Sequence, residues 1–524
     1  MKNIFYISVI GLGLLMGSCA DFLDRQPLSD LSVATYWKSE QDLKTWNAAM
    51  YDGLQSTLRT NWFDWGEVRA GGYAARGTGY DINLLGNSLT SSSGSTSWSN
   101  LYNTIYRANA AIKNIPLSGL GSTVTNPYIG QAYTMRALMY FYAIRVWGDV
   151  PMITEPMEDV ATQQIYYSRS SISDIKNLML SDIEKALTAF GPSSDLTTAS
   201  KFYLNRGAAL ALKMDILMWF KDYDNALVVG NDLLTNYKYA LAPHSNYIGQ
   251  FLDPTTSNEM IFNLSWSYEE DGNGFGYAQR IASGSNTIMY HPSEAIFRTL
   301  VERKKEDIRT IAIMDTLWLS TFINPTEMTT ETYASAYAGT YGNAAGFQIK
   351  CPKFVPYLAT ANSGKGGYAY ANNGEDNTKM PIYRLADILL LKAEALTLKT
   401  TPDLAGAIKI VNDIRTRAGY TKLANIVDYP TSDTILNLIL DERRIELWAE
   451  GKIWFDLVRN DKVKEYLDPI YKAADPLSAG FVIGVEKPSP DFVGGYGRML
   501  WPLNQDVFKK NPEMKGKQNQ PYDE

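Results

Sequence analysis

Two segments of the chain, 203–237 and 385–418, each have the pattern of a helical hairpin of about 35 residues. In both, apolar residues recur at spacings of three and four, and a short polar turn separates the two halves. Small residues line the first helix of the earlier pair, at Gly207, Ala208 and Ala211. Small side chains let two helix axes approach closely, so such pairs stack on their neighbours and bury a shared core. This pattern favours a mainly α architecture.

Helix pairs of this length resemble tetratricopeptide units, but long insertions separate them here. Helical spacing predicts further helices over 35–54, 101–115, 128–146, 173–190, 293–313 and 434–459. Residues 62–99 lose this periodicity and predict a long loop, and loops of that length are often functional. Residues 251–383 alternate irregular stretches with short strand-like runs. We expect one mainly α domain over 32–524: a tetratricopeptide-like scaffold of helical pairs with long irregular loop and short-strand insertions.

The helix predicted over 434–459 carries a dense run of charged residues. Asp441 and Arg444 are three residues apart, and so are Arg443 and Glu446. Side chains at this spacing meet along the surface of a helix. The sequence therefore predicts ion pairs within this helix.

The first residues predict export and a lipid anchor. An almost uninterrupted apolar run over 4–16 follows Lys2; it has the length of a signal-peptide core and is too short to span a bilayer of ~30 Å. The sequence Leu-Met-Gly-Ser-Cys at 15–19 resembles the lipobox of bacterial lipoproteins. We expect a signal peptide over 1–18, a lipidated Cys19 and a tether over 19–31. The alternative is an ordinary secreted protein with an incidental cysteine.

Composition disfavours several classes of function. The net charge is −7, and Lys and Arg are dispersed, which argues against nucleic-acid binding. The only histidines are His244 and His291, so a Ser-His or Cys-His nucleophile is not expected. No Cys and His residues stand at zinc-ligand spacing, and no cofactor is expected. With Cys19 lipidated, Cys351 has no partner for an intramolecular disulfide, and we expect it to be a buried thiol.

A weak calcium candidate lies in a glycine-rich stretch. It consists of Glu269, Glu270, Asp271 and Asn273, which supply the oxygen ligands that Ca²⁺ prefers. A solvated acidic turn explains the same residues equally simply, so the sequence leaves this calcium site open. It predicts no other metal site.

Aromatic residues give the candidate ligand site. The chain has 34 Tyr and 12 Trp, and these side chains join a flat apolar face to a polar group, as sugar-binding surfaces require. Two stretches combine them with glycines and with polar side chains that can bond hydroxyl groups. The first holds Trp62, Trp65, Arg69, Tyr73, Arg76, Tyr80, Asn83 and Asn87, and the second holds Trp266, Tyr268, Asn273, Phe275, Tyr277 and Gln279. Core packing explains any one of them equally well. Trp98 precedes the helix predicted over 101–115 and falls within a motif that the family resemblance given next marks as a core helix, so it is assigned to the core.

Several motifs occur in the order typical of one family. They are Cys19-Ala20-Asp21-Phe22-Leu23-Asp24; Trp98 with Leu101, Tyr102, Ile105, Ala108 and Asn109; Met135-Arg136-Ala137 through Gly148-Asp149-Val150-Pro151; 384–395; 441–459; and 501–522. Together they resemble the SusD/RagB family, the surface nutrient-binding lipoproteins of Bacteroidetes-type bacteria. Lys452 and Ile453 depart from the His-Arg that usually follows Glu-Gly in that family.

This resemblance implies a non-catalytic binding protein, lipid-anchored in the outer membrane and exposed at the cell surface. It also implies a partner, a SusC-like TonB-dependent β-barrel transporter that the chain covers as a lid. The motifs mark the scaffold and none marks a ligand site. We expect capture of a nutrient oligomer, an oligosaccharide, for that transporter. Two alternatives remain: the same fold binding oligopeptides, and a surface glycoside hydrolase, because 56 acidic residues leave room for a catalytic carboxylate pair.

Overall fold

The computed structural model describes thirteen stretches of the chain. They are 36–59, 61–75, 82–87, 89–159, 161–192, 200–271, 280–281, 290–303, 306–314, 351–358, 367–368, 377–472 and 499–523. Within them, no helix is both long enough and apolar enough to cross a membrane. Residues 1–35, with the expected signal peptide, Cys19 and the whole tether over 19–31, lie outside the described part of the chain.

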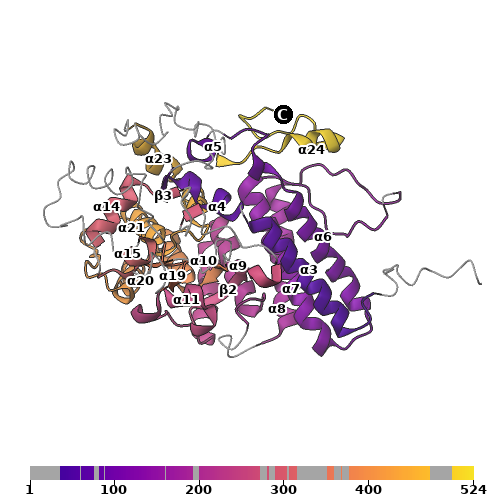
Figure 1. The fold of residues 1–524 in the computed structure, drawn as a ribbon, viewed down its shortest axis with the longest axis horizontal. Helices are drawn as coiled ribbons and strands as arrows, with labels where there is room; N and C mark the ends of the chain where they lie inside the picture. Colours follow the sequence, from indigo (N-terminus) through magenta and orange to yellow (C-terminus); the bar gives the residue numbers. More distant parts are fainter. Residues whose placement is uncertain are drawn as a thin grey trace, which may run out of the picture.

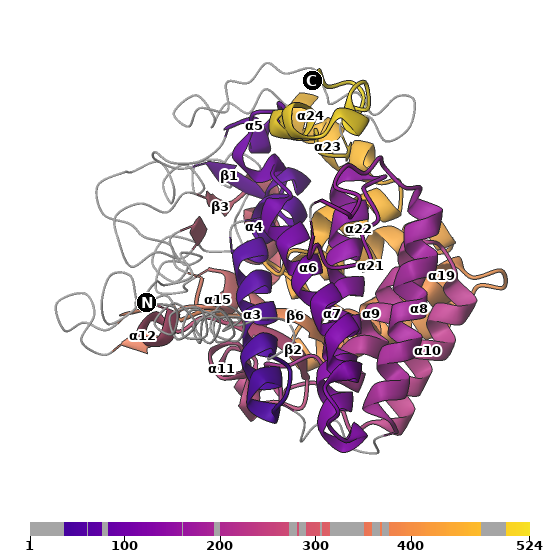
Figure 2. The same cartoon turned by 90° about the vertical axis from the view of Figure 1, so that its right-hand side faces the viewer.

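Helices far apart in the sequence form one continuous stack (Figures 1 and 2). Each packs against the next in the order α3, α6, α7, α8, α9, α10, α19 and α20, and α21 packs against α19. Their bounds are α3 Glu40–Leu58, α6 Ser99–Asn114, α7 Ser122–Trp147, α8 Ile172–Phe190, α9 Arg206–Trp219, α10 Tyr223–Asn236, α19 Leu385–Leu398, α20 Leu404–Ala418 and α21 Ser432–Glu446. The insertion at 251–383 separates α10 from α19 in sequence, yet these helices are in direct contact. Both predicted hairpins are confirmed, and the insertion leaves the stack of helices continuous.

Short polar residues fix where these helices begin. Ser39 and Asp42 form a capping box at the start of α3, and Ser171 accepts a backbone hydrogen bond at the start of α8. Asn205 and Asp403 cap α9 and α20 in the same way. Gly419 ends α20 with φ at +82°, a conformation that costs glycine little. The boundaries of the stack are thus encoded locally.

Two predicted helices are wrong in part. The expected helix over 293–313 is divided into α14, Glu294–Arg303, and α15, Ile308–Ile313. The expected helix over 434–459 is divided into α21, which ends at Glu446, and α22, Ile453–Arg459. Between them Ala449 and Gly451 have φ of +60° and +72°, which no α-helix allows. A Cβ on Gly451 would lie 2.2 Å from Trp62 Nε1. The turn therefore brings the backbone close against the indole of Trp62, and a continuous helix could not.

The predicted loop over 62–99 is also wrong in part, because it contains short helices and a strand. These are α4 Asn61–Gly66, a 3₁₀ turn Val68–Ala70, β1 Tyr73–Ala75, α5 Ile82–Leu85 and a 3₁₀ turn Gly94–Thr96. Six residues make α4 too short for helical periodicity to stand out in the sequence.

The described strands form three two-stranded antiparallel sheets. β1 pairs with β3, Tyr290–Pro292; β2, Met260–Ser265, pairs with β6, Lys379–Arg384; and β4, Tyr357–Leu358, pairs with β5, Gly367–Tyr368. Short helices complete the described chain: α11 Gly249–Leu252, α12 Tyr268–Asp271, α14 Glu294–Arg303, α15 Ile308–Ile313, α23 Val463–Lys472 and α24 Gln505–Lys510. The short-strand insertion expected over 251–383 is confirmed where the structure describes it.

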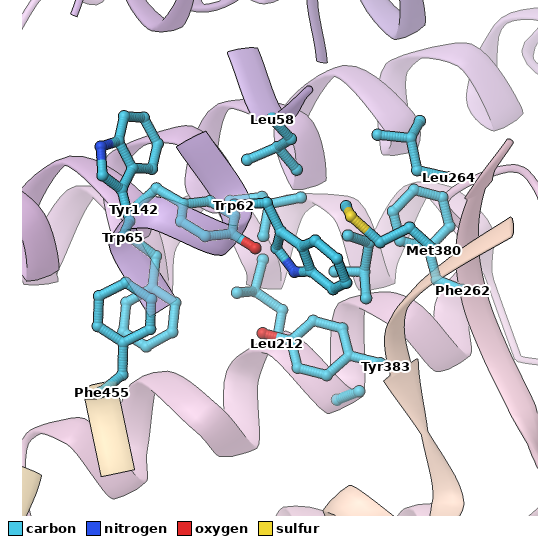
Figure 3. Close-up of a cluster of buried hydrophobic side chains, with 14 of the residues drawn as sticks. Leu58, Trp62, Trp65, Tyr142, Leu212, Phe262, Leu264, Met380, Tyr383 and Phe455 are labelled. Atoms are coloured by element: carbon cyan, nitrogen blue, oxygen red, sulfur yellow. The ribbon is translucent and has the colours of Figure 1, made fainter. Parts of the chain in front are cut away.

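Side chains from the stack and the insertion share one core. Figure 3 shows its centre, where Leu58 of α3, Trp62 of α4, Tyr142 of α7, Phe262 of β2 and Met380 of β6 point toward one another. All five are buried. The insertion is therefore joined to the stack of helices through apolar packing.

A buried ionic network makes the second connection between the stack and the insertion. On α21, Glu442 pairs with Arg303, Arg309 and Arg415. One turn later, Glu446 pairs with Arg309, Arg384 and Arg417. The expected pair between Arg443 and Glu446 is wrong, because Arg443 instead bonds Asp387 and Asp456 at 2.8 and 2.7 Å. These charges hold elements together in three dimensions rather than along one helix.

Candidate functional site

The first group of expected ligand residues lies largely in the core. Trp62, Trp65, Arg69 and Tyr73 are all buried. Trp65 Nε1 donates to the Ser95 carbonyl oxygen at 2.9 Å, and the centroid of the Tyr73 ring lies 4.3 Å from that of Trp448. Figure 3 shows Trp62 and Trp65 enclosed by apolar side chains. As placed, these residues present no ring face to a ligand, and core packing accounts for them.

Arg69 shows why this stretch looked like a binding site. Its guanidinium carbon lies 4.1 Å from the centroid of the Trp454 ring and 5.5 Å from that of Trp501, and its Nε donates to Asn87 Oδ1 at 2.6 Å. The structure thus brings Arg69 and Asn87 together, but in the interior. An arginine among aromatic rings and amides is chemistry that a core and a sugar site share.

The remaining candidates divide between surface and undescribed chain. Trp266 is buried, Tyr268 is 42% exposed at the start of α12, and Asn83 is half-buried on α5. Arg76, Tyr80, Asn273, Phe275, Tyr277 and Gln279 lie outside the described residues. Among the candidate aromatic residues that the structure describes, Tyr268 is therefore the one exposed to solvent.

The calcium candidate gains no support from the described residues. Glu269 and Glu270 are exposed on α12, and Asn273 lies outside the described chain. Within the described part, no group of three or more His, Cys, Asp or Glu side chains is placed to hold a metal ion. Cys351 is buried and its Sγ donates to the Ala312 carbonyl oxygen at 3.2 Å. Burial raises the pKa of this thiol to about 12, so it stays protonated at neutral pH.

A pocket of about 220 Å³ lies where α6, the 151–167 segment and α24 meet, and we call it the Trp98 pocket. Its inner surface is formed by Trp98, Tyr102, Ile153 and Tyr167. Ile165 lies at its edge and is 46% exposed. The pocket therefore offers aromatic and aliphatic surface that solvent reaches.

Hydrogen bonds and ring contacts hold this surface rigid. Trp98 stands edge-on to Tyr102 and to Trp147, with centroids 5.4 and 5.7 Å apart. Tyr102 Oη donates to the Pro151 carbonyl oxygen at 2.6 Å. Burial raises the pKa of Tyr102 well above its ordinary value, so the phenol remains a neutral donor. A preformed surface of this kind loses little entropy when a ligand binds.

The C-terminal segment supplies the polar rim. Asn504 Nδ2 donates to Thr96 Oγ1 at 2.9 Å, and Asn511 Nδ2 donates to the Tyr167 carbonyl oxygen at 2.8 Å. These two bonds hold α24 beside the pocket. Asp506 and Lys510, which are exposed on α24, then place an acceptor and a donor at its mouth. The arrangement can stack an apolar ring face and bond the hydroxyl groups around it.

Sequence reasoning missed this site. Trp98 was assigned to the core because it begins a helix motif, but it stands one residue before α6 and only part of its surface is buried. Tyr167 and α24 are far from it in sequence, so no local pattern could join them. The available signal was the position of Trp98 at a helix start, where a side chain can face both the core and solvent.

Comparisons with known proteins agree along the whole chain. The SusD family model matches residues 310–522, and a model described as "Starch-binding associating with outer membrane" matches residues 21–214. SusD-like protein P38 of Formosa agariphila is 31% identical, with 99% of each chain covered. A SusD-like protein of Bacteroides ovatus is 24% identical over 85% of this chain and 80% of its own.

Solved structures have the same fold. A SusD superfamily protein from Bacteroides fragilis matches with a TM-score of 0.68 at 18% identity, covering 93% of this chain and all of its own. A structure described as a laminarin-binding SusD-like protein matches with a TM-score of 0.64 at 19% identity, with the same coverage. The expected mainly α, tetratricopeptide-like architecture is confirmed. By sequence along nearly its full length, this chain belongs to the SusD/RagB family.

Proposed function

We propose that this protein binds an oligosaccharide at the cell surface and that the Trp98 pocket takes one of its sugar rings. The observation that carries the proposal is the pocket itself, with its rigid aromatic surface beside exposed Asp506 and Lys510. A cavity of about 220 Å³ is below the ~300–1,000 Å³ that encloses a whole drug-sized ligand. It suits part of an oligomer whose remaining units extend across the surface.

The relatives support the same class of ligand. One matching family model is described as starch-binding, and one structural neighbour is described as laminarin-binding. Starch and laminarin are neutral glucose polymers, and pyranose rings offer both an apolar face for stacking and hydroxyl groups for the rim. Capture and release of such a ligand require no covalent chemistry.

Tyr167→Ala is expected to weaken binding of the preferred hexasaccharide about three- to tenfold. An aromatic contact contributes ~0.5–1.5 kcal/mol beyond its buried area, and 1.4 kcal/mol is tenfold in Kd. The matched control is Tyr166→Ala, which removes a neighbouring exposed ring that does not line the pocket. The measurement is isothermal titration of both variants against maltohexaose, laminarihexaose and other neutral hexasaccharides.

That titration, a parallel titration with oligopeptides and an assay for reducing ends have three outcomes that would overturn the proposal in whole or in part. If the protein binds oligopeptides and has no affinity for any glycan, its function would be peptide capture by the same fold. Release of reducing ends from the polymer by the purified protein would indicate a hydrolase. Equal affinity of the two tyrosine variants would show that the site lies elsewhere.

The N-terminus supports a further part of the proposal, that the mature protein is a lipoprotein beginning at Cys19. Two or more acyl chains, at ~0.8 kcal/mol per buried CH₂, would anchor a chain that otherwise needs no membrane contact. Cys19→Ser is expected to move the protein from the membrane fraction to a secreted or periplasmic one. Protease treatment of intact cells then tests surface exposure: the lipidated protein is cleaved if it faces outward and protected if it faces inward.

We further propose that a SusC-like TonB-dependent transporter receives the ligand, because the resemblance to SusD/RagB proteins implies such a partner. Purification of a tagged chain from solubilised outer membranes tests this association. A preparation free of any β-barrel protein would contradict it.

A further inference from the structure

A second pocket, of about 470 Å³, lies between α14, the segment after α20 and α21, and we call it the Arg444 pocket. Its surface is more polar than that of the Trp98 pocket. Tyr420 and Tyr429 stand on one side, and Thr434, Asn437 and Arg444 line the α21 side. Neither the family motifs nor the comparisons assign a role to it.

Charged side chains that are already paired with one another form the inner wall of the pocket. Arg303 pairs with Asp307 and Glu442, each at 3.0 Å, and Arg415 Nε bonds Glu442 at 2.8 Å. The Tyr420 ring lies against both guanidinium groups, at 4.6 and 5.5 Å from its centroid. Both guanidinium groups are therefore already paired with carboxylates, and they offer little positive charge to a ligand.

Arg444 is different, because its guanidinium forms no hydrogen bond or ion pair with any described residue. Its nearest aromatic contact is Tyr466, at 5.3 Å from the ring centroid. Nε is buried without an acceptor, and the half-buried Arg444 side chain lines the pocket. Leaving a buried donor unsatisfied destabilises the folded state, so a strong donor kept in this state is a feature that packing does not explain.

The neighbouring groups on α21 can bond a chain of hydroxyl groups. Thr434, Asn437, Asp441 and Arg444 follow at spacings of three, four and three, which places them on one face of the helix. Asn437 Nδ2 donates to Glu465 at 2.9 Å, which fixes the amide with its Oδ1 unpaired. The row extends over about 15 Å at 1.5 Å per residue. It presents donors and acceptors in turn over the length of a short oligomer.

The balance of charge decides the class of ligand. The charged residues that line the pocket are three arginines and three carboxylates: Arg303, Arg415, Arg444, Glu302, Asp428 and Asp441. Because Arg303 and Arg415 are already paired with Asp307 and Glu442, an anion would meet more unpaired negative than positive charge. A hydroxyl group both donates and accepts, so it can pair with carboxylates and with a guanidinium. We propose that the Arg444 pocket binds a neutral saccharide unit.

The two pockets would act on the same polymer, an inference that rests on the proposed glycan binding. In Figure 1 α6 and α24, beside the Trp98 pocket, lie on the right, and α14, α20 and α21 lie on the left. We expect a hexasaccharide to occupy one pocket at a time and a long polymer to bind both. Binding at two linked sites raises apparent affinity without any new contact.

Isothermal titration with maltohexaose, laminarihexaose and an oligouronate of equal length tests this inference. Arg444→Met keeps the aliphatic stem and removes the guanidinium, and Lys464→Met on α23 is the matched control outside the pocket. We expect two equivalents of neutral hexasaccharide on the unchanged protein and on Lys464→Met, and one on Arg444→Met. Tyr167→Ala is expected to keep two equivalents, with one of the two sites weakened about three- to tenfold. With the long polymer, Arg444→Met is expected to weaken binding tenfold or more. Unchanged melting of Arg444→Met establishes that the fold is intact.

The variants separate the two proposals. If Arg444→Met matches the unchanged protein in stoichiometry and polymer affinity, the second site is excluded while the Trp98 pocket stands. If Arg444→Met abolishes binding and Tyr167→Ala leaves the affinity unchanged, the Arg444 pocket holds and the Trp98 assignment fails. Tighter binding of the oligouronate in an Arg444-dependent manner overturns the neutral class. Absence of binding to every glycan overturns both proposals.

Discussion

Glu446→Ala is expected to lower the free energy of unfolding by about 3–5 kcal/mol, because breaking a buried ion pair leaves its partners uncompensated. Glu446 is fully buried and pairs with Arg309 at 3.2 Å, with Arg384 at 2.7 Å and with Arg417. All three guanidinium groups are buried or nearly so. The substitution therefore removes the carboxylate that three buried guanidinium groups share, and water cannot readily replace it. Urea unfolding followed by tryptophan fluorescence measures the change.

The control for this prediction is an ion pair on the surface of the same stack. Lys409 and Asp413 pair on α20 at 2.6 Å, with both side chains more than half exposed. Asp413→Ala is expected to change stability by less than about 0.5 kcal/mol, as exposed pairs on a helix usually do. Glu446→Gln keeps the volume and loses the charge, so it should fall between the two. Similar losses for Glu446→Ala and Asp413→Ala would contradict a structural role for the network.

The same network makes the protein sensitive to acid. Burial alone would raise the pKa of Glu446, but Arg417, Arg384 and Arg309 outweigh it and hold the pKa below its ordinary value. The pKa of Glu442 is lowered in the same way, against burial, by Arg303, Arg309 and Arg415. Because both folded-state pKa values are depressed, their contribution is present above the ordinary value of 4.5 and is lost as pH falls below it.

Local patterns predicted the scaffold well. The hairpins at 203–237 and 385–418 combine helical spacing, small residues and a polar turn. Each of these signals lies within a few residues of what it determines. Helices that follow one another in the stack pack together, although long segments separate α3 from α6 and α10 from α19 in the sequence.

Features that depend on distant residues could not be predicted. Trp62 and Trp65 lie in a glycine-rich stretch typical of a surface loop, but α7, α22 and the β2–β6 sheet enclose them. Arg443 has a partner three residues away at Glu446, yet Asp387 and Asp456 lie closer in space. The Trp98 pocket joins residues from both ends of the chain. In each case the deciding contact is tertiary, and periodicity carries no information about it.

Glu67 gives the second prediction, in which removing a charge stabilises the protein. The side chain lies after α4 and is 1% exposed. Its Oε1 accepts from the backbone N–H groups of Gly451 and Lys452, at 2.7 and 3.1 Å, and Tyr73 Oη lies 3.2 Å from Oε2. Burial raises the pKa to about 8, and these hydrogen bonds and the charge of Lys353 offset it only in part. The folded protein thus keeps a proton that the unfolded chain loses above its ordinary pKa of 4.5.

Glu67→Gln is expected to leave stability unchanged at pH 5 within about 1 kcal/mol and to raise it at pH 9 by up to about 5 kcal/mol. At 1.36 kcal/mol per pKa unit, the unsubstituted protein loses stability as pH rises from 4.5 to about 8, because deprotonation is favoured in the unfolded state. Glutamine can accept the same two backbone hydrogen bonds through its oxygen and donate to Tyr73 through its nitrogen, and it does not titrate. Urea unfolding of both proteins at pH 5, 7 and 9 gives the comparison. Parallel stability curves over this range would mean that Glu67 is ionised in the folded state, and the neutral buried carboxyl would be ruled out.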